Sequence, residues 1–536
     1  MTSTAPTRAK TAEATAPGSP PPATPSAATS DLADPPPDCA VGFRGDVQIT
    51  PVEDGFALVA ATGAFAVRRP GTELEDALRR MTSSQVSLAE SLEPLSAAGR
   101  AQLSRIVAAV RPLLARYLLA GTRKLVRVEP TAQGASYDPG EVPPGALVRL
   151  SKFALCRSKD GVLVLESPLA RHRAVLLDPA AQALVAALGT ATSSDALTTA
   201  ELPATAVTEL LSHLIGAGLA EVGRLDGGLA SFSSDTDPVL RQWDFHDLLL
   251  HSRSRSGRFD EPFGGIFPYR GEIEPQPAVK DPPAGPRIAL YRPSWEEIQA
   301  RDPSLTTVIE GRESIRSYGE QPLTAEQLGE FLYRVARVRA WHGPIEGAPY
   351  EVTTRPYPCG GAAYELELYL AVRRCVGLEP GIYYYDPNGH QLVLINAGEA
   401  DRQAMLRVAW VSSAMQANPD VLITMASRFQ RLSWKYRGIA YAVSLKHAGV
   451  LYQTMYLVAT AMGLAPCGLG SGDSDLAARA LGLDYLREST VGDFILGSRP
   501  EVRPADPTAV DPVEWRPVND HEWRSAAQAE LAARRA

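Results

Sequence analysis

The sequence lacks the features that mark disulfide-rich, zinc-binding, membrane-spanning or secreted proteins. Its 536 residues include only five cysteines, which are scattered and free of CxxC spacing. This usage argues against a disulfide framework and a structural zinc cluster, and it suits a reducing cytoplasm. No apolar run reaches the ~18 residues that suggest a transmembrane helix, and the N-terminus has no apolar segment of the signal-peptide type.

An excess of positive charge is also missing, since the formal net charge is −8. A general nucleic-acid binder usually shows a basic domain or stripe, so this class is disfavoured. Hydrophobic residues make up 45% of the chain and charged residues 21%, as in soluble globular proteins. The length is too great for one core and predicts two to four domains.

The first part of the chain predicts a disordered tail followed by a small α+β domain. Residues 1–38 are rich in Ala, Pro, Ser and Thr and cannot bury enough apolar surface to fold. Residues 39–130 contain an alternating stretch at 47–67, which predicts a hairpin. Apolar residues then recur at helical spacing from 96 to 119, which predicts a helix over that range.

Residues 131–232 predict a second small domain with a winged-helix-like order of strand, helix, helix and wing. The helix expected at 205–217 carries no Lys or Arg, so it cannot neutralise nucleic-acid phosphates. We therefore expect this domain to dock a peptide or a subunit, with strand addition at a sheet edge as one route. A packing or dimerisation domain is an equally good interpretation.

A connector is expected at 233–286, and a larger α+β domain at 287–505 is followed by a C-terminal tail at 506–536. The connector holds His246 and His251, but no metal-binding motif accompanies them, so we predict no metal site. In the large domain, Thr324 and Gln327 fit a capping box. The longest apolar helix is expected at 443–464. The pattern predicts a mixed sheet with long central helices.

A Lys-Tyr pair stands just before that long helix, in the segment 433–438. Lys435 and Tyr436 lie side by side on an expected turn, flanked by Trp434 and Arg437. Lysine and tyrosine side chains serve as acids or bases only where their surroundings move their pKa values toward neutrality. The alternative interpretation is an ordinary surface turn, because such pairs are common.

Arg312, Ser314 and Arg316 offer two guanidinium groups and a hydroxyl within five residues. If this segment is helical, the two arginines share a face and can bind a phosphate monoester bidentately. A solvated basic helix is the alternative.

Two glycine-containing segments, at 358–361 and 468–472, bring bare backbone close to a flat or anionic ligand. Neither is a G-x-G-x-x-G dinucleotide motif. Cys359 and Cys467 fall beside these glycines, and either a small tolerated side chain or a reactive thiol fits there.

Taken in order, the segments 312–316, 355–364, 434–438 and 468–472 resemble the SagB-type azoline dehydrogenases. These are nitroreductase-like, FMN-dependent oxidases of thiazole- and oxazole-containing ribosomal peptides. The connector at 243–255 is also similar to a segment of that family, so the resemblance covers roughly residues 240–500. It implies an α+β fold in which a C-terminal nitroreductase-like FMN domain follows two small winged-helix-like domains.

The resemblance also implies roles for individual residues. Arg312, Ser314 and Arg316 would hold the FMN phosphate and ribityl end. Pro358, Cys359, Gly360 and Gly361 would meet the flavin from the second subunit of a homodimer. Gly468, Leu469 and Gly470 would lie against the flavin ring, and Gly497 and Arg499 would close the phosphate end. Lys435 and Tyr436 would be the catalytic pair, with no metal.

The sequence departs from the family pattern at two of these motif positions. The family often has serine where Cys359 stands and proline where Glu365 stands. The first change is nearly isosteric, and we expect the second to affect only the local turn.

The implied activity is FMN-dependent dehydrogenation of azolines to azoles in a precursor peptide, in thiopeptide or linear azole peptide biosynthesis, with oxygen as the electron acceptor. A cyclodehydratase is the implied partner, and neither nucleic acid nor membrane is expected as one. Two alternatives stay open. An NAD(P)H-dependent nitro- or quinone reductase would use the same scaffold, and a non-enzymatic leader-peptide-binding scaffold would bind no flavin. A winged-helix regulator is disfavoured by charge.

Overall fold

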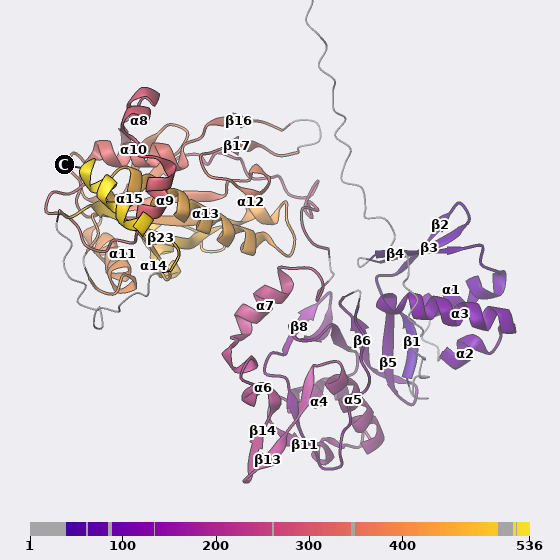
Figure 1. Cartoon of the computed structure of the whole chain (residues 1–536). Helices are drawn as coiled ribbons and strands as arrows, with labels where there is room; N and C mark the ends of the chain where they lie inside the picture. The colour runs from indigo at the N-terminus through magenta and orange to yellow at the C-terminus, as the bar shows by residue number, and fades with distance from the viewer. Residues whose placement is uncertain are drawn as a thin grey trace, which may run out of the picture. The chain divides into compact units, whose positions relative to one another are not determined.

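The computed structural model describes residues 39–60, 63–83, 88–132, 134–259, 262–344, 349–416, 418–501, 518–520 and 522–535. The expected disordered tail at 1–38 lies outside them. The chain divides into two compact units, Met1–Pro262 and Phe263–Ala536 (Figure 1). The division therefore falls inside the expected connector at 233–286. None of the helices in the described part of the chain combines the length and apolar character needed to cross a lipid bilayer.

A six-stranded antiparallel sheet organises the N-terminal unit, in the order β1-β5-β6-β10-β9-β8. Its strands are β1 (Cys39–Phe43), β5 (Leu114–Ala120), β6 (Arg123–Pro130), β8 (Leu155–Lys159), β9 (Val162–Glu166) and β10 (His172–Leu176). Strand β6 pairs with β10, from Val126 opposite Leu176 to Pro130 opposite His172. The two small domains expected at 39–130 and 131–232 therefore share one sheet. The pairing of β6 with β10 joins segments that are distant in the sequence, so local patterns do not predict it.

Two three-stranded sheets accompany the large one, in the orders β2-β3-β4 and β11-β7-β12. The first group comprises β2 (Gln48–Val52), β3 (Gly55–Ala60), β4 (Gly63–Arg68), α1 (Thr72–Ser83), α2 (Leu88–Leu92) and α3 (Ala97–Ala109). The second comprises β7 (Leu147–Leu150), α4 (Pro179–Ala187), β11 (Thr192–Ser193), α5 (Ala204–Gly216) and β12 (Ala220–Val222). In the second group β7, α4, α5 and β12 follow one another as strand, helix, helix and strand, with the short strand β11 between the two helices. The unit continues with β13 (Arg224–Asp226), β14 (Leu229–Ser231), α6 (Ser233–Thr236) and α7 (Phe245–Arg253).

Two local predictions in this unit need correction. The hairpin expected at 47–67 has a third strand, since β4 pairs with β3. The helix expected at 96–119 ends at Ala109, and the chain from Leu114 onward forms β5. Pro112 is the reason, because proline has no N–H to continue the helical hydrogen bonds and its ring clashes with the preceding turn.

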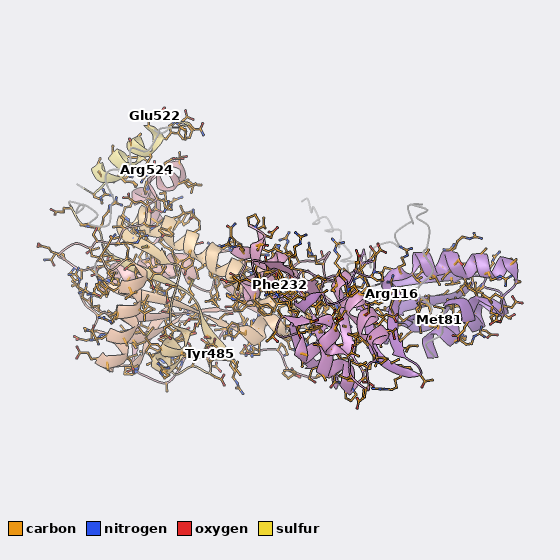
Figure 2. All side chains as sticks on the ribbon, turned by 90° about the horizontal axis from the view of Figure 1, so that it is seen from below. Met81, Arg116, Phe232, Tyr485, Glu522 and Arg524 are labelled. Atoms are coloured by element: carbon orange, nitrogen blue, oxygen red, sulfur yellow. The ribbon has the colours of Figure 1, made fainter. Side chains whose placement is uncertain are left out.

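Two buried histidines of the N-terminal unit, His172 and His213, pack against Tyr137. The Tyr137 hydroxyl lies 2.8 Å from Nδ1 of His213, and the Tyr137 ring packs edge-on against His172 and His213. Arg116, labelled in Figure 2, lies over the Tyr137 ring at 4.6 Å. Burial, followed by the charge of Arg116, lowers the pKa of each histidine to about 4.

We expect the unit to lose stability as the pH falls from about 6.5 to about 4. Over this range the unfolded chain binds protons at both histidines while the folded chain does not, so the free energy of unfolding decreases. A depression of this size corresponds to about 3 kcal/mol per histidine. Urea unfolding at pH 7, 5.5 and 4 measures it. The double variant His172→Gln, His213→Gln should show a shallower dependence, and an unchanged slope would contradict the assignment.

A seven-stranded sheet forms the centre of the C-terminal unit, in the order β15-β20-β19-β18-β21-β23-β22. Its strands are β15 (Arg287–Ala289), β18 (Leu366–Val372), β19 (Gly381–Asp386), β20 (Gln391–Asn396), β21 (Val421–Arg428), β22 (Leu464–Leu469) and β23 (Glu488–Ser498). Every pair in this sheet is antiparallel, whereas a mixed sheet was predicted. A separate ribbon pairs β16 (Ala340–His342) with β17 (Val352–Thr354).

Helices cover both faces of this sheet, so its central strands are buried throughout. Along β18, Leu366, Leu368 and Leu370 belong to one core, while Tyr369 and Ala371 belong to the other. The first core includes α10 (Ala325–Ala336) and α13 (Ala440–Ala461), and the second includes α11 (Glu399–Ser412) and α14 (Ser474–Leu481). The capping box at Thr324 and Gln327 is confirmed, and α13 is the long helix expected at 443–464.

The remaining helices of this unit are α8 (Trp295–Arg301), α9 (Leu305–Gly311), α12 (Phe429–Ser433) and α15 (Glu522–Ala533). Helix α15 lies in the stretch expected to be a tail, and it packs against α9. A Cβ atom on Gly311 would come within 2.4 Å of the Leu531 side chain, so the Leu531 side chain of α15 packs directly against the backbone of α9 there. Glu522 and Arg524, labelled in Figure 2, lie on α15, and Arg524 approaches Glu313 to 3.8 Å.

Candidate functional site

Lys435 and Tyr436 lie on the turn between α12 and α13, as the sequence predicts. The segment that follows the division of the chain holds this turn in place. Arg437 exchanges two backbone hydrogen bonds with Gly264, at 2.9 and 3.0 Å, and the Phe267 N–H donates to the Lys435 carbonyl. The Trp434 side chain is buried, and its Nε1 donates to the Ile273 carbonyl at 2.6 Å.

Aromatic rings and two oxygen acceptors surround the end of the Lys435 side chain. Its Nζ donates to the Tyr350 hydroxyl and, at 3.3 Å, to the Gly361 carbonyl. It also lies 4.8 Å from the ring centre of Tyr350, 5.2 Å from that of Tyr436 and 6.0 Å from that of Phe267. These are contacts that an ammonium group makes with ring faces. The side chain is therefore held in one place from several directions.

The Gly360–Gly361 peptide faces the Lys-Tyr pair directly. Gly361 has a φ of +62°, in the left-handed region that favours glycine. A Cβ atom on it would lie 1.9 Å from Lys435 Nζ and 2.7 Å from the Tyr436 hydroxyl. The Lys435 amine and the Tyr436 hydroxyl therefore reach the same backbone segment, at a distance that only glycine allows.

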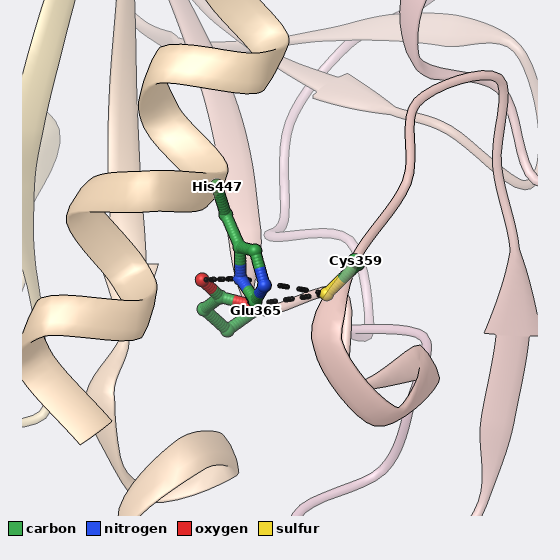
Figure 3. Close-up of side chains that lie close together, drawn as sticks. All are labelled: Cys359, Glu365 and His447. Atoms are coloured by element: carbon green, nitrogen blue, oxygen red, sulfur yellow. Dashed lines mark hydrogen bonds and ion pairs between the residues drawn. The ribbon is translucent and has the colours of Figure 1, made fainter. Parts of the chain in front are cut away.

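Cys359, Glu365 and His447 form a buried cluster behind this peptide (Figure 3). The Gly360 N–H donates to Nε2 of His447 at 2.8 Å, and Nδ1 of His447 lies 2.8 Å from a Glu365 carboxylate oxygen. The Cys359 thiol lies 3.7 Å from the other carboxylate oxygen. Burial and the nearby Glu365 charge raise the pKa of Cys359 to about 12, so it is a thiol rather than a reactive thiolate.

The structure corrects the expected helical turn at Arg312, Ser314 and Arg316. Helix α9 ends at Gly311, and the chain that follows is extended. Burial alternates along it, with Glu313 and Ile315 buried, so the three expected residues share the less buried side. The two guanidinium groups thus reach a common face through a period of two rather than a helical turn. Among the described residues, neither Arg312 nor Arg316 has a carboxylate partner within ion-pair distance.

Tyr456 on α13 joins this segment to the glycine-rich end of β22. Its hydroxyl lies 2.8 Å from the Ser314 hydroxyl and accepts the Gly468 N–H at 2.8 Å, while Arg312 lies over its ring at 5.2 Å. Leu469 is buried and its carbonyl accepts from the Tyr452 hydroxyl. Among the described residues, no heavy atom lies within 4 Å of a Cβ placed on Gly470, so its backbone is bare on that side.

Gly497 and Arg499 lie near this segment but are occupied by other contacts. A Cβ atom on Gly497 would fall 2.3 Å from the Tyr318 ring, so this glycine makes room for an aromatic side chain. Arg499 donates to Glu313 at 2.5 Å. Its charge is thereby engaged with a carboxylate on the neighbouring strand-like segment.

The expected site residues therefore form two groups along α13, one at His447 and the other at Tyr456. His447 and Tyr456 are nine positions apart on this helix, or roughly 13 Å along its axis. The sequence reasoning missed Tyr350, His447 and Glu365, and it missed Tyr456 as the residue that connects Ser314 with Gly468. Only Tyr456 had a local signal, because Tyr452 and Tyr456 recur one turn apart on the predicted helix.

Comparisons with known proteins match two stretches of the chain. Residues 148–260 match the family model of the cyanobactin oxidase ThcOx, and residues 309–498 match the nitroreductase family. The second match agrees with the α+β sheet and helices of the C-terminal unit. The two models cover separate parts of the chain, one in each unit.

Three curated relatives share the C-terminal similarity. A protein of Methanocaldococcus jannaschii named as a nitroreductase (MJ1384) is 29% identical over 187 residues, which are 35% of this chain and 86% of that protein. The microcin B17-processing protein McbC of Escherichia coli is 27% identical, over 30% of this chain and 57% of McbC. The trifolitoxin-processing protein TfxB of Rhizobium leguminosarum bv. trifolii is 26% identical, over 26% of this chain and 38% of TfxB. The resemblance to the azoline dehydrogenases is thereby confirmed.

Proposed function

We propose that this chain, which resembles the azoline dehydrogenases, is a flavin-dependent oxidoreductase that oxidises azoline rings of a ribosomally made peptide to azoles. The observation that carries the proposal is the convergence of Lys435 Nζ and the Tyr436 hydroxyl on the Gly361 backbone, inside a nitroreductase-type unit. An ordinary flavin reductase needs no such pair of proton-transfer groups. The names of the relatives McbC and TfxB, both peptide-processing proteins, support the same substrate class.

The residues that are present fit FMN. Arg312, Ser314 and Arg316 share one side of an extended segment, with both guanidinium groups free of carboxylates in the described structure. This donor set suits a phosphate monoester. Bare backbone at Gly468 and Gly470 adjoins it through Tyr456 and suits a flat ring. Because Arg499 is bound to Glu313, we assign it to positioning that segment rather than to direct phosphate contact.

Conversion of an azoline to an azole removes a proton from the former α-carbon and a hydride from the former β-carbon. FMN, when bound, supplies the acceptor for the hydride. Lys435 and Tyr436 move the proton and stabilise charge on the ring nitrogen, which requires both groups to face one ring edge. Tyr350 and the Gly361 carbonyl hold Lys435 Nζ for this task. Trp434 and Phe267 border the turn and limit the access of water.

The absorption spectrum of the purified chain tests the cofactor, and an azoline-containing peptide tests the reaction. A flavin spectrum with about one released FMN per chain, and loss of two hydrogen atoms per ring by mass spectrometry, is the expected result. A protein that binds no flavin after reconstitution would leave a leader-binding scaffold as the better account. The nitroreductase relatives favour a second candidate, an NAD(P)H-dependent reductase. Rapid reduction of the bound flavin by NAD(P)H, without azoline oxidation, would support that candidate.

Arg312→Ala and Arg316→Ala are each expected to weaken FMN binding by roughly 10- to 100-fold, because a hydrogen bond to a charged group contributes about 1.5–3 kcal/mol. Fluorescence titration of the flavin-free protein measures the change. Arg487→Ala is the matched control, since Arg487 is exposed and its ion pair among the described residues is with Asp484. Equal affinities for all three variants would remove the phosphate assignment.

The N-terminal unit is proposed to bring the precursor peptide to the site, and a ring-forming cyclodehydratase is proposed to supply its azolines. Docking outside the reacting ring raises the effective concentration of a weakly bound substrate. The intact protein should then show a lower KM for an azoline peptide that keeps its upstream segment than for one without it. Equal KM values would limit this unit to a structural role. A homodimer is proposed because the resemblance implies a flavin site shared between two subunits, and light scattering tests it.

A further inference from the structure

His447 and Glu365 form a buried ionisable pair behind the Gly360–Gly361 segment. Glu365 is fully buried and His447 is 6% exposed. They lie 82 residues apart in the chain, His447 on α13 and Glu365 just before β18. A buried carboxylate is costly unless its hydrogen bonds are satisfied.

The hydrogen bonds determine which imidazole nitrogen carries the proton. Nε2 of His447 accepts the Gly360 N–H at 2.8 Å, so Nε2 is unprotonated. Nδ1 then carries the proton and donates to the Glu365 carboxylate, whose two oxygens lie at 2.8 and 3.1 Å. The Cys359 thiol is a second donor to this carboxylate, at 3.7 Å. The Gly360 N–H thus donates to His447, and His447 donates in turn to the buried Glu365 carboxylate. Figure 3 shows the His447, Glu365 and Cys359 side chains.

The ligand atoms of Cys359, Glu365 and His447 lie within 4.8 Å of one another. The position of the imidazole proton on Nδ1 nevertheless argues against a metal ion bound by these three side chains. A metal bound to Nδ1 would require the proton on Nε2, which would then face the Gly360 N–H, donor against donor.

We propose that His447 and Glu365 form a positioning dyad that fixes the Gly360–Gly361 peptide against Lys435 and Tyr436. The inference rests on the proposed azoline oxidation for its effect on rate, but its structural content is independent of that reaction. Glu365 orients the imidazole, and the imidazole holds the Gly360 N–H. At the other end of this two-residue segment, the Gly361 carbonyl accepts from the Tyr350 hydroxyl at 2.9 Å and from Lys435 at 3.3 Å.

Two adjacent glycines explain why such a device is needed. Glycine backbone reorients easily, because no Cβ restricts it. The same absence of side chains lets Lys435 and Tyr436 approach this closely. The dyad restores the rigidity that the glycines remove, so that Lys435 and Tyr436 keep one geometry relative to the Gly361 backbone.

His447→Gln tests the proposal, with His390→Gln as the matched control. His390 is also buried in the C-terminal unit, and its two nitrogens lie 3.0 Å from the Tyr385 hydroxyl and 2.8 Å from the Tyr291 carbonyl, away from Lys435. For His447→Gln we expect kcat for azoline oxidation to fall roughly 10- to 100-fold, with KM and flavin content little changed. Hydrogen exchange in residues 359–364 should become faster. His390→Gln should change neither kcat nor this exchange.

Glu365→Gln provides a second variant of nearly the same shape. Its amide oxygen can still accept from Nδ1, but a neutral acceptor is weaker than a carboxylate. We expect a smaller loss of kcat, roughly 3- to 10-fold, with the protein folded and yellow. An unchanged kcat and unchanged exchange in both variants would overturn the dyad, as would equal losses in His390→Gln. If the wild-type protein oxidises no azoline while exchange at 359–364 still rises in His447→Gln, the proposed function fails and the dyad stands.

Discussion

Lys435→Ala and Tyr436→Phe are each expected to lower the rate of azoline oxidation by roughly 10²- to 10⁴-fold, the range typical of general acid–base groups. Neither substitution should unfold the protein, because both side chains lie on a turn and are only partly buried. The flavin should remain bound, since the residues assigned to its phosphate lie around Tyr456 on a separate part of α13. Steady-state oxidation of an azoline peptide, with flavin content from the absorption spectrum, measures both effects.

The two variants also separate the roles of the pair. If the Lys435 amine exchanges the proton, added small amines should restore part of the rate to Lys435→Ala, whereas they should not help Tyr436→Phe. Arg437→Ala is the matched control, because Arg437 is exposed and contributes only its backbone to the pairing with Gly264. Normal turnover in both Lys435→Ala and Tyr436→Phe, with FMN bound, would remove the pair from the mechanism.

Local signals in the sequence predict much of the secondary structure around the site. The capping box at Thr324 and Gln327 and the apolar run of α13 need only neighbouring residues to act, so they are visible in the sequence. The turn that carries Lys435 is also local. The break of the helix expected at 96–119 was visible as Pro112, but the apolar spacing of the following strand happened to fit a helix as well.

The same ambiguity explains the error at Arg312, Ser314 and Arg316. Residues spaced by two share a face in an extended chain, and residues spaced by four share one in a helix. Arg312 and Arg316 satisfy both rules, so the spacing alone could not choose between them. Both a helix and an extended chain would place the two guanidinium groups on one side, so that part of the prediction agrees with the structure.

Contacts between distant segments could not be predicted, and they complete the candidate site. Tyr350 lies 85 residues before Lys435, and His447 lies 82 residues after Glu365. The expectation that Glu365 affects only a local turn was wrong, because this side chain is buried against α13. Cys359 contacts the same pair, so both departures from the family pattern belong to one cluster. These residues are brought together by the antiparallel sheet and by the packing of α13 against it. Local sequence patterns do not predict such contacts.

Gly361→Ala is expected to lower azoline oxidation by roughly 100-fold while it changes stability by only about 1 kcal/mol. The added Cβ would lie 1.9 Å from Lys435 Nζ and 2.7 Å from the Tyr436 hydroxyl, so both groups must move. Because each contact is with the end of a side chain, the fold can accommodate the methyl group. The reacting geometry cannot, since a shift of about 1 Å is enough to cost a large part of the rate.

Gly482→Ala separates this displacement from backbone strain. Gly482 has a φ of +68°, close to the +62° of Gly361, and a Cβ there would meet no atom of the described residues within 4 Å. Both variants should therefore lose a similar amount of thermal stability, whereas only Gly361→Ala should lose activity. Melting temperature and kcat, measured for both variants, distinguish backbone strain from displacement of Lys435 and Tyr436. Equal activities in the two variants would mean that the approach of Lys435 and Tyr436 to the Gly361 backbone has no part in the reaction.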